Sequence, residues 1–431
     1  MPEAMADASR IWVVSELYYP EDTSTGYYLT RIAEGLAERS PDPVHVLCGR
    51  PNYAARGRKV SKTETRRGVF IERCPSTTWN KDRLPLRIVN LLTLSLSMFW
   101  LALRRFRRGD RVLVVTNPPL LPFVISWACR LRGARCVLLI HDVYPNVAVA
   151  AGLLRPDSFF TRCLNQIVGR LYRSVDEIVV LGRDMRDLVL EKLPPGDHRV
   201  RIIPNWADTD LVKPQTGGNR ILRELGLLDK FVVQYSGNMG RSHNLEAIVE
   251  AAKRLQDQKD IHFLLSGSGA KKAWLAREIR EQVLENITTL DRRPREELPE
   301  LLTAGDVALI TFVPGMAGIS VPSRLYNMLA AGMPILALAD AHSEVALVVQ
   351  EENVGVVVPA ENIPAFKEAI LQFAADKKRR SEMAQRARLA AETKYQFETI
   401  LEAYCDVLEV SRNDWEWALP TTTGEKRKRV A

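Results

Sequence analysis

Short apolar runs alternate with helix-length segments along most of the chain, and they do so in two separate series. Most runs consist of Val, Ile and Leu without polar alternation, which is typical of strands that are buried on both faces of a parallel sheet. The expected strands lie at 11–15, 44–48, 111–116, 136–140, 177–181 and 200–203 in the first series, and at 231–235, 261–265, 288–290, 307–310, 335–338 and 355–358 in the second. A polar segment with Gly217 and Gly218 separates the two series. The sequence therefore predicts an α/β protein with two doubly wound, Rossmann-like domains.

The length of the chain agrees with two domains. Its 431 residues exceed the number that one hydrophobic core usually organises, about 250–300. We expect an N-terminal domain over residues 1–212 and a C-terminal domain over residues 213–394. Loops at the carboxyl ends of parallel strands bind ligands, so the natural site is the gap between the two domains.

Composition narrows the choice of compartment and partner. The six cysteines form no CxxC pair, and we expect them to be reduced core residues of a cytoplasmic protein. Residues 1–10 are polar and do not resemble a secretory signal, which leads to the same expectation. The net charge of +8 indicates a phosphate-bearing partner or an anionic membrane surface. No nucleic-acid-binding motif accompanies this charge, so we expect no nucleic acid partner.

The segment 315–338 combines a loop, a short helix and a strand in an order that suits a phosphate group. Ser320 or Ser323 is the expected N-cap, with Pro322 in the first turn. A helix N-terminus presents free N–H groups and the positive end of the helix dipole. Ser323 and Arg324 would add a hydroxyl donor and a fixed cation. The same pattern also fits an ordinary loop–helix–strand unit.

Two further groups stand at the ends of predicted strands. Gly237, Gly240 and Arg241 lie between a strand and a helix, as a diphosphate cradle requires. His141 directly follows an apolar strand, at the edge of the sheet where ligands bind, which favours a functional role over a surface turn. The cradle segment lacks the GxxxxGK[ST] pattern of a P-loop, and no GxGxxG follows the first strand.

Two other motifs are less specific. Gly26 opens the helix expected at 27–38, where it either lets a ligand approach the backbone closely or only relieves a turn. Asp208 and Asp210 have the spacing of a metal-binding pair, but no apolar strand runs into them. We interpret the pair as structural and expect no metal site.

The run 84–103 is the most apolar part of the chain, and it ends in the cations Arg104, Arg105, Arg107 and Arg108. Its uninterrupted apolar portion is too short to cross a bilayer, which takes about 20 residues. Two interpretations remain open. The run is either a buried helix of the first domain, or a helix with an exposed edge that enters an anionic membrane, with these four arginines on lipid phosphates.

Five segments together resemble the GT-B glycosyltransferases of family 4, in the branch of the colanic-acid and O-antigen fucosaminyl transferases. They are YYPEDTSTGYY, HDVYPNVAVAAG, IIPNWAD, YSGNMGRSHNLEAI and VPSRLYNMLAAGMPILA. The resemblance implies two domains facing across a cleft and a retaining, metal-independent transfer from a UDP- or GDP-sugar, without another cofactor. It also implies that a helix at 395–411 packs back on the N-terminal domain, ahead of a basic, disordered tail at 412–431.

The resemblance also assigns roles to single residues. His141 is the catalytic residue, and Gly26 and Tyr27 lie on the acceptor side. The donor-binding residues are Gly237, Gly240, Arg241, Ser323, Arg324 and Asn327. Two departures stand out. The paired glutamates of the family fall at Ile319 and Asn327, of which only Asn327 can still hydrogen-bond a ribose hydroxyl. His243 takes the place of the usual lysine in the first diphosphate loop.

We therefore expect a glycosyltransferase of cell-surface polysaccharide biosynthesis that acts on a polyprenyl-diphosphate-linked glycan. Such an acceptor would explain the apolar run with its arginines, and it places the protein peripherally on the inner face of the plasma membrane. Two alternatives stay open. One is a nucleotide-sugar epimerase of the same architecture, and the other is a catalytically silent nucleotide-sugar-binding protein, given the missing glutamates.

Overall fold

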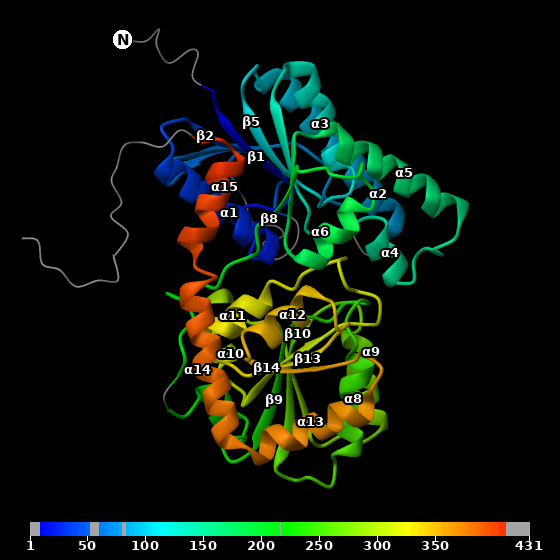
Figure 1. Cartoon of the computed structure of the whole chain (residues 1–431), viewed down its shortest axis with the longest axis vertical. Helices are drawn as coiled ribbons and strands as arrows, with labels where there is room; N and C mark the ends of the chain where they lie inside the picture. The colour runs from blue at the N-terminus through cyan, green and yellow to red at the C-terminus, as the bar shows by residue number, and fades with distance from the viewer. Residues whose placement is uncertain (1–8, 52–59, 80–82, 216, 411–431) are drawn as a thin grey trace, which may run out of the picture.

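The computed structural model describes residues 9–51, 60–79, 83–215 and 217–410. Two α/β domains lie one above the other along the long axis of the molecule (Figure 1). The tail expected at 412–431 lies outside the described residues.

An eight-stranded sheet forms the N-terminal domain, in the order β3-β4-β2-β1-β5-β6-β7-β8. Its strands pair in parallel, except for the antiparallel hairpin of β3 and β4. The strands are β1 (Ile11–Ser15), β2 (Val44–Cys48), β3 (Thr63–Arg66), β4 (Val69–Arg73), β5 (Arg111–Val115), β6 (Arg135–Leu139), β7 (Glu177–Val180) and β8 (Val200–Ile202).

A six-stranded, fully parallel sheet forms the C-terminal domain, in the order β11-β10-β9-β12-β13-β14. The strands are β9 (Phe231–Asn238), β10 (Ile261–Ser268), β11 (Ile287–Leu290), β12 (Val307–Thr311), β13 (Ile335–Leu338) and β14 (Gly355–Val358). Every strand expected from an apolar run is confirmed in both sheets, with ends that differ by a few residues at most.

The β3–β4 hairpin was not expected, and its first strand shows why. The sequence of β3 is Thr-Glu-Thr-Arg, and its side chains are exposed or partly exposed at the edge of the sheet. An edge strand of this kind is held by backbone hydrogen bonds to its neighbour and needs no apolar run.

Helices cover both sheets (Figure 1). Those of the N-terminal domain are α1 (Ser24–Arg39), α2 (Leu84–Arg105), α3 (Leu121–Arg132), α4 (Asn146–Ala150), α5 (Phe159–Ser174) and α6 (Arg183–Leu190). Those that follow are α7 (Arg220–Glu224), α8 (Leu245–Arg254), α9 (Lys272–Glu281), the 3-10 helix η1 (Arg295–Glu297), α10 (Leu298–Leu302), α11 (Arg324–Ala330), α12 (Glu344–Glu351), α13 (Ile363–Ala375), α14 (Lys377–Thr393) and α15 (Phe397–Val407).

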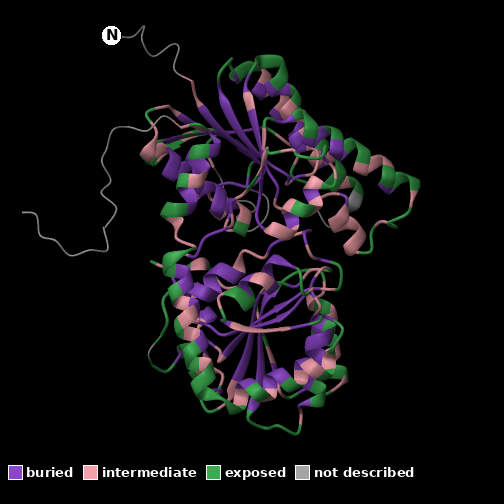
Figure 2. Cartoon of the chain, in the orientation of Figure 1, coloured by how far each residue is buried: buried purple, intermediate pink, exposed green. Residues whose placement is uncertain are grey.

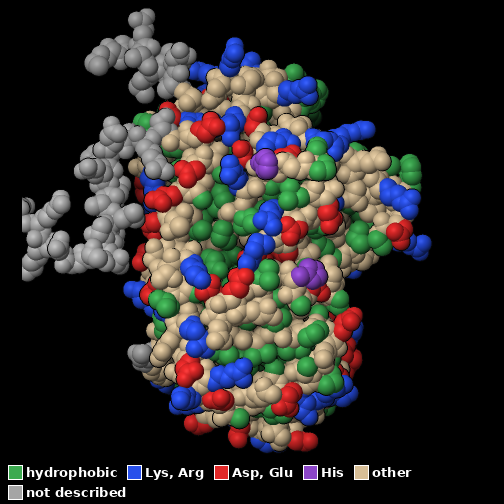
Figure 3. All heavy atoms as spheres, viewed as in Figure 1, with side chains coloured by type: hydrophobic (Ala, Val, Ile, Leu, Met, Phe, Trp, Pro, Cys, Tyr) green, Lys and Arg blue, Asp and Glu red, His purple; other side chains and the backbone are tan. Residues whose placement is uncertain are grey.

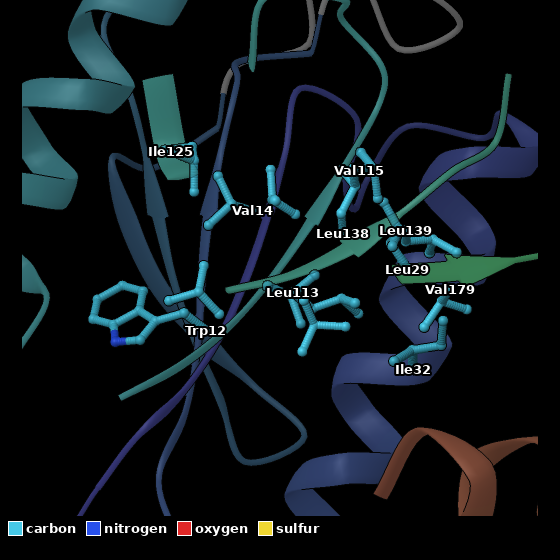
Figure 4. Packing of buried hydrophobic residues seen from close by; sticks show 14 of the residues in the cluster. Trp12, Val14, Leu29, Ile32, Leu113, Val115, Ile125, Leu138, Leu139 and Val179 are labelled. Atoms are coloured by element: carbon cyan, nitrogen blue, oxygen red, sulfur yellow. The ribbon is translucent and has the colours of Figure 1, made fainter. Parts of the chain in front are cut away.

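Each sheet is the centre of its domain's core, with buried residues concentrated on the strands (Figure 2). In the N-terminal domain Val14, Leu113 and Leu138 come from three neighbouring strands, and Leu29 and Ile32 come from the helix packed on them (Figure 4). All five are fully or almost fully buried. The continuous apolar strands therefore contact helices on both faces, as a doubly wound sheet requires.

The last described helix, α15, belongs to the core of the N-terminal domain although it follows the C-terminal domain in sequence. Leu401 and Tyr404 of α15 are buried in that core. A side chain at Gly35 of α1 would collide with Leu401, so the two helices approach closely at this glycine. The chain thus crosses between the domains twice, once before α7 and once before α15.

Helix α2 contains the apolar run 84–103, and only one of its faces is covered. Leu94, Met98 and Ala102 are buried in the core. On the other side the side chains of Ile88, Leu92, Leu96 and Trp100 are 46–59% exposed. By length and composition Pro85–Arg105 is long and apolar enough to cross a membrane, so the expectation that the run is too short was wrong. Only 28% of its most apolar window is buried. The helix is therefore not a fully buried core helix, and it carries the exposed apolar edge of the second interpretation.

The packing of α15 predicts the effect of one truncation. Leu401→Ala removes a buried side chain and leaves a cavity against α1, which typically lowers the free energy of unfolding by about 2–5 kcal/mol. Urea denaturation followed by circular dichroism measures this change. Leu389→Ala is the matched control because Leu389 is exposed on α14, and its midpoint should stay unchanged. Equal midpoints for the wild type and Leu401→Ala would contradict this packing.

Candidate active site

The carboxyl ends of the two sheets meet at the boundary between the domains, where short backbone contacts connect them. The N–H of Val143 donates to the carbonyl of Ile319 at 2.9 Å. Asp142 and Ser320 form an antiparallel bridge beside it. The loop after β6 and the loop before α11 are therefore neighbours across the cleft.

The strands β9 and β10 end in two glycines that lie side by side. Gly237 pairs with Gly267 in the parallel register. A side chain on Gly267 would collide with the carbonyl of Gly237, and a side chain on Gly237 would collide with the guanidinium of Arg324. Both glycines have φ angles near +153° that side-chain-bearing residues rarely adopt. Gly237 therefore leaves room for Arg324, and Gly267 leaves room for the backbone of β9.

Arg324 is a cation at the start of α11 whose hydrogen-bonding capacity is only partly used. Its Nη1 donates to the carbonyl of Ser236 at 3.3 Å, and its guanidinium carbon lies 4.6 Å from the centre of the Tyr235 ring. Nε and Nη2 are buried and have no hydrogen-bond partner among the described residues. A buried guanidinium without a counter-ion is costly, so these two N–H groups suit an anionic ligand with paired oxygens.

Ser323 precedes Arg324, but it does not cap α11 as the sequence suggested. It occupies the N-cap position with helical backbone angles, and its side chain makes no capping hydrogen bond. Ser320, the other expected cap, instead forms the bridge with Asp142 and hydrogen-bonds its carboxyl group. Gly332 follows the end of the helix with a φ of +64°, the left-handed conformation in which helices often terminate at glycine.

The loop between β9 and α8 holds the rest of the predicted diphosphate cradle. Arg241 is exposed to solvent on this loop, and Gly240 packs against the side chain of Asn238. His243 is buried beside Phe312, and burial, with Arg324 and Lys271 nearby, lowers its pKa well below the usual value. The imidazole is therefore neutral, and it does not replace the charge of the lysine that the family has at this position.

His141 lies on the N-terminal side of the cleft. Its Nδ1 is 3.4 Å from the hydroxyl of Thr25, and its backbone N–H donates to Thr116 Oγ1 at 3.0 Å. Burial lowers the pKa of His141 to about 4. The imidazole is therefore neutral at pH 7, and it can hydrogen-bond a sugar hydroxyl without carrying a charge.

Gly26 and Tyr27, the residues predicted on the acceptor side, are both occupied by contacts within the protein. A side chain on Gly26 would lie 2.7 Å from the carbonyl of Glu21, so the glycine relieves a tight turn and offers no open approach to a ligand. The hydroxyl of Tyr27 donates to Asp208 Oδ2 at 2.5 Å. The guanidinium of Arg295 covers the Tyr27 ring, with its carbon 3.2 Å from the ring centre.

These contacts form a cluster that we name the Asp208 junction, consisting of Tyr27, Asp208, Arg295 and Asn327. Arg295 forms a 3.1 Å ion pair with Asp208. Asn327 Oδ1 accepts from the backbone N–H of Asp208 at 3.2 Å. The structural interpretation of Asp208 is therefore supported. Its partners were not found from sequence, because no pattern links residues so far apart.

Two properties of the described residues bear on cations and lipids. No group of three or more His, Cys, Asp or Glu side chains in the described ranges is placed to hold a metal ion. All four predicted membrane arginines, Arg104, Arg105, Arg107 and Arg108, are exposed. Arg105 also forms a 2.9 Å ion pair with Glu72.

Comparison with known proteins agrees with this geometry. Residues 24–206 match the family model described as "Glycosyl transferase 4-like domain", and residues 220–390 match the one described as "Glycosyl transferases group 1". The chain is 33% identical over 349 residues to the probable glycosyltransferase WbjE of Pseudomonas aeruginosa, covering 80% of this chain and 85% of WbjE. It is 28% identical over 378 residues to the putative colanic acid biosynthesis glycosyl transferase WcaI of Escherichia coli K12, covering 84% of this chain and 91% of WcaI.

A solved structure of the same architecture is that of Anabaena Alr3699/HepE in complex with UDP-glucose. It has a TM-score of 0.69 and 15% identity, and the match covers 93% of this chain and 99% of HepE. The fold is thus the two-domain GT-B fold expected from the sequence. With two family models matching consecutive halves and a relative above 30% identity along most of both chains, this protein belongs to the family 4 glycosyltransferases.

Proposed function

We propose that the protein transfers a sugar, with retention of anomeric configuration and without a metal ion, from a UDP- or GDP-sugar to a lipid-linked glycan. The observation that carries the donor half is the guanidinium of Arg324 at the end of β9, whose Nε and Nη2 are buried without a hydrogen-bond partner among the described residues. A nucleotide diphosphate supplies the paired anionic oxygens that such a group lacks. HepE, which has the same fold, is solved with UDP-glucose bound, and this supports the choice of ligand.

Arg324 would act on the charge that develops during transfer. The bond between the anomeric carbon and the diphosphate breaks, and an acceptor hydroxyl oxygen forms the new bond on the same face of the sugar. The hydroxyl proton passes to the departing β-phosphate oxygen. Fixed cationic donors at that oxygen stabilise the transition state, because they need no reorganisation while charge builds up. Arg241, on the exposed side of the loop, adds a more weakly held cation.

The family's first glutamate is absent here, and the structure indicates what stands in its place. Ile319 is buried, and its carbonyl accepts from Val143. The donor sugar would therefore meet a backbone-paired apolar residue on one side and neutral His141 on the other. In this proposal His141 orients a hydroxyl of the sugar or the acceptor by hydrogen bonding.

A surface on the N-terminal domain supports the lipid-linked acceptor. We name it the apolar face, and its exposed side chains are Ile88, Leu92, Leu96 and Trp100 of α2 and Trp127 and Leu131 of α3. The stacked rings of Phe99 and Trp127, 5.1 Å apart, join the two helices. Arg87, Arg104 and Arg130 on the same helices are exposed. Apolar side chains flanked by cations suit an anionic membrane surface.

The relatives support a role in polysaccharide biosynthesis. WcaI is described as acting in colanic acid biosynthesis, which is the assembly of a cell-surface polysaccharide. We propose the same class of process for this protein, with the protein on the cytoplasmic face of the plasma membrane where nucleotide sugars are present.

Arg324 gives the test of the donor site. Arg324→Ala should weaken UDP or GDP binding in calorimetry by about 1.5–3 kcal/mol for each charge-assisted hydrogen bond that is lost. Arg241→Ala should weaken it less, because that side chain is exposed. Arg254→Ala, an exposed arginine of α8 in the same domain, is the control and should change nothing. EDTA should leave wild-type binding and transfer unchanged. If Arg324→Ala bound UDP or GDP with wild-type affinity, the diphosphate would not bind at this position.

His141 gives a test that depends on pH. His141→Ala should lower turnover on the order of tenfold or more, as loss of a positioned group does, with UDP affinity nearly unchanged. The neutral imidazole is the active form, and it is lost only as the pH falls through its folded pKa of about 4. The ratio of wild-type to variant turnover should therefore stay constant from pH 7.5 to about 5.5, although a free histidine titrates near 6.5. A ratio that halves near pH 6.5 would contradict the buried, neutral state.

The apolar face gives a test of membrane binding. The triple variant Leu92→Ser, Leu96→Ser, Trp100→Ser should lose binding to anionic vesicles at low salt, because buried apolar area contributes about 25 cal/mol per Å². Vesicle sedimentation measures this loss, and UDP affinity should remain. Leu389→Ser, in the other domain, is the control. A wild-type protein that stays in the supernatant with such vesicles would argue for a soluble acceptor.

A further inference from the structure

The loop between β12 and α11, residues 312–323, leads directly into Arg324, and we name it the α11 loop. Carboxylates hold the backbone of this loop from both domains. On one side Asp340, which follows β13 in the same domain, accepts from the N–H groups of Gly315 at 3.3 Å and of Ala317 at 3.0 Å. The first half of the α11 loop is therefore fixed by its own domain.

The second half is held by Asp184, which belongs to the N-terminal domain and lies in the first turn of α6. Asp184 Oδ2 accepts from the N–H of Gly318 at 2.7 Å and from the N–H of Glu344 at 2.9 Å. Glu344 is the first residue of α12, so the carboxylate also lies at the positive end of that helix dipole. One carboxylate oxygen thus connects α6 to two segments of the C-terminal domain, the α11 loop and the start of α12.

The backbones approach closely at this contact, and each domain contributes a glycine to it. A side chain on Gly182, the residue before α6, would lie 2.8 Å from the side chain of Glu344. A side chain on Gly318 would lie 2.7 Å from the carbonyl oxygen of Asp184, and Gly318 also has a φ of +73°. A larger residue at either position would push the two domains apart here. The chain is therefore built to bring the carboxylate of Asp184 onto the α11 loop.

Arg183, the neighbour of Asp184, holds the same two helices together. Its Nε forms a 3.0 Å ion pair with Glu344, and its Nη1 forms a 2.6 Å ion pair with Glu351. α6 and α12 meet at the boundary between the domains (Figure 1), and Lys and Arg side chains lie beside Asp and Glu side chains at this level of the surface (Figure 3). Partly exposed ion pairs contribute little by themselves, so we assign them a supporting role and the positioning of the loop to Asp184.

We propose that Asp184 is a positioning residue for sugar transfer, because it sets the α11 loop relative to the N-terminal wall of the cleft. Ile319 follows Gly318 directly, and its carbonyl accepts from Val143, two residues after His141. The hydrogen bond from Gly318 to Asp184 therefore fixes the loop beside the point where both walls meet. This role rests on the proposed function, since it takes the α11 loop as one wall of the donor-sugar site.

The position of Asp184 separates its effect on transfer from its effect on nucleotide binding. Arg324 and the glycine ends of β9 and β10 all belong to the C-terminal domain, so the diphosphate needs no group from α6. Transfer needs both walls in register, and a displacement of about 1 Å can lower a rate about a hundredfold. Loss of Asp184 should therefore lower turnover and leave nucleotide affinity nearly unchanged.

The test compares turnover with UDP affinity in the full-length protein. Turnover is measured as UDP release from UDP-glucose or UDP-N-acetylglucosamine, with the donor that the wild type consumes faster. Asp184→Ala should lower it about tenfold or more, with UDP affinity in calorimetry within about twofold of wild type. Asp184→Asn should recover most of the turnover, because its amide oxygen still accepts hydrogen bonds from Gly318 and Glu344. Asp187→Asn is the matched control, an exposed aspartate of α6 that pairs with its neighbour Arg186, and it should equal the wild type.

Hydrogen exchange tests the contact itself without a substrate. In Asp184→Ala the N–H of Gly318 loses its acceptor, so exchange in the α11 loop should become about tenfold faster or more. Exchange in β9 and β10 should stay unchanged, because those strands are paired within their own sheet. Mass spectrometry of peptides from the α11 loop and from the two strands measures both rates in one experiment.

The outcomes separate a positioning role from a structural one. Equal losses of turnover and UDP affinity in Asp184→Ala would show that the residue only maintains the fold. Wild-type turnover in Asp184→Ala, equally low turnover in Asp184→Asn, or unchanged exchange in the α11 loop would each overturn the proposal. A wild type that binds neither UDP nor GDP and consumes no nucleotide sugar would instead refute the proposed function. The exchange rates would still decide whether Asp184 holds the loop, so the two failures are distinguishable.

Discussion

Parallel strand pairing is the constraint on which this structure depends. Among the strands that the structure describes, only β3 and β4 pair antiparallel, so the carboxyl ends of the other strands within each sheet lie at one edge. The two domains turn these edges toward each other, which places His141 and Arg324 on opposite sides of one cleft. Apolar strands buried on both faces fix this direction, because a reversed strand would require a different set of crossover connections. The arrangement of the two sheets therefore determines where the site lies.

The glycines at the ends of β9 and β10 show how the sheet and the site are connected. Gly237 and Gly267 extend the parallel pairing beyond the apolar part of each strand. The missing side chain of Gly237 lets the guanidinium of Arg324 lie against the backbone, with Nη1 hydrogen-bonded to Ser236 and with Nε and Nη2 unpartnered among the described residues. A larger residue at either position would move the cation or the strand. A buried charge without a counter-ion destabilises the free protein, which is consistent with a ligand that supplies the counter-charge.

Most of the fold followed from the sequence, because continuous apolar runs are a strong local signal for buried parallel strands. The β3–β4 hairpin lacked that signal, since an exposed edge strand needs only backbone partners. The positions of His141, Gly237 and Arg324 were predictable because each lies at a strand end or helix start, and their roles stay predictions. Contacts between residues distant in sequence were not predictable. Those of Asn327 and Tyr27 with Asp208 are of this kind.

The Asp208 junction gives the first crossing between the domains a specific geometry. Asp208 lies on the connection itself, and it is held by Tyr27 from the N-terminal domain and by Arg295 from the C-terminal domain. A second ion pair, between Asp22 and Arg292 at 3.5 Å, joins the segments that precede α1 and η1. Asn327, on the helix that begins with Arg324, contacts Asp208 as well. Asp208 therefore links helix α11, which begins with Arg324, to the connection between the domains.

The apolar face also limits how the protein could meet a membrane. It lies on α2 and α3, and α3 packs against α5, on which Phe159, Arg162 and Arg170 are exposed. A bilayer that covers the apolar face would bring its headgroups close to these α5 side chains, since cations prefer the interface and not the hydrocarbon. A lipid-linked acceptor would then reach the domain boundary from the membrane surface, while a soluble nucleotide sugar would enter the cleft from the C-terminal domain.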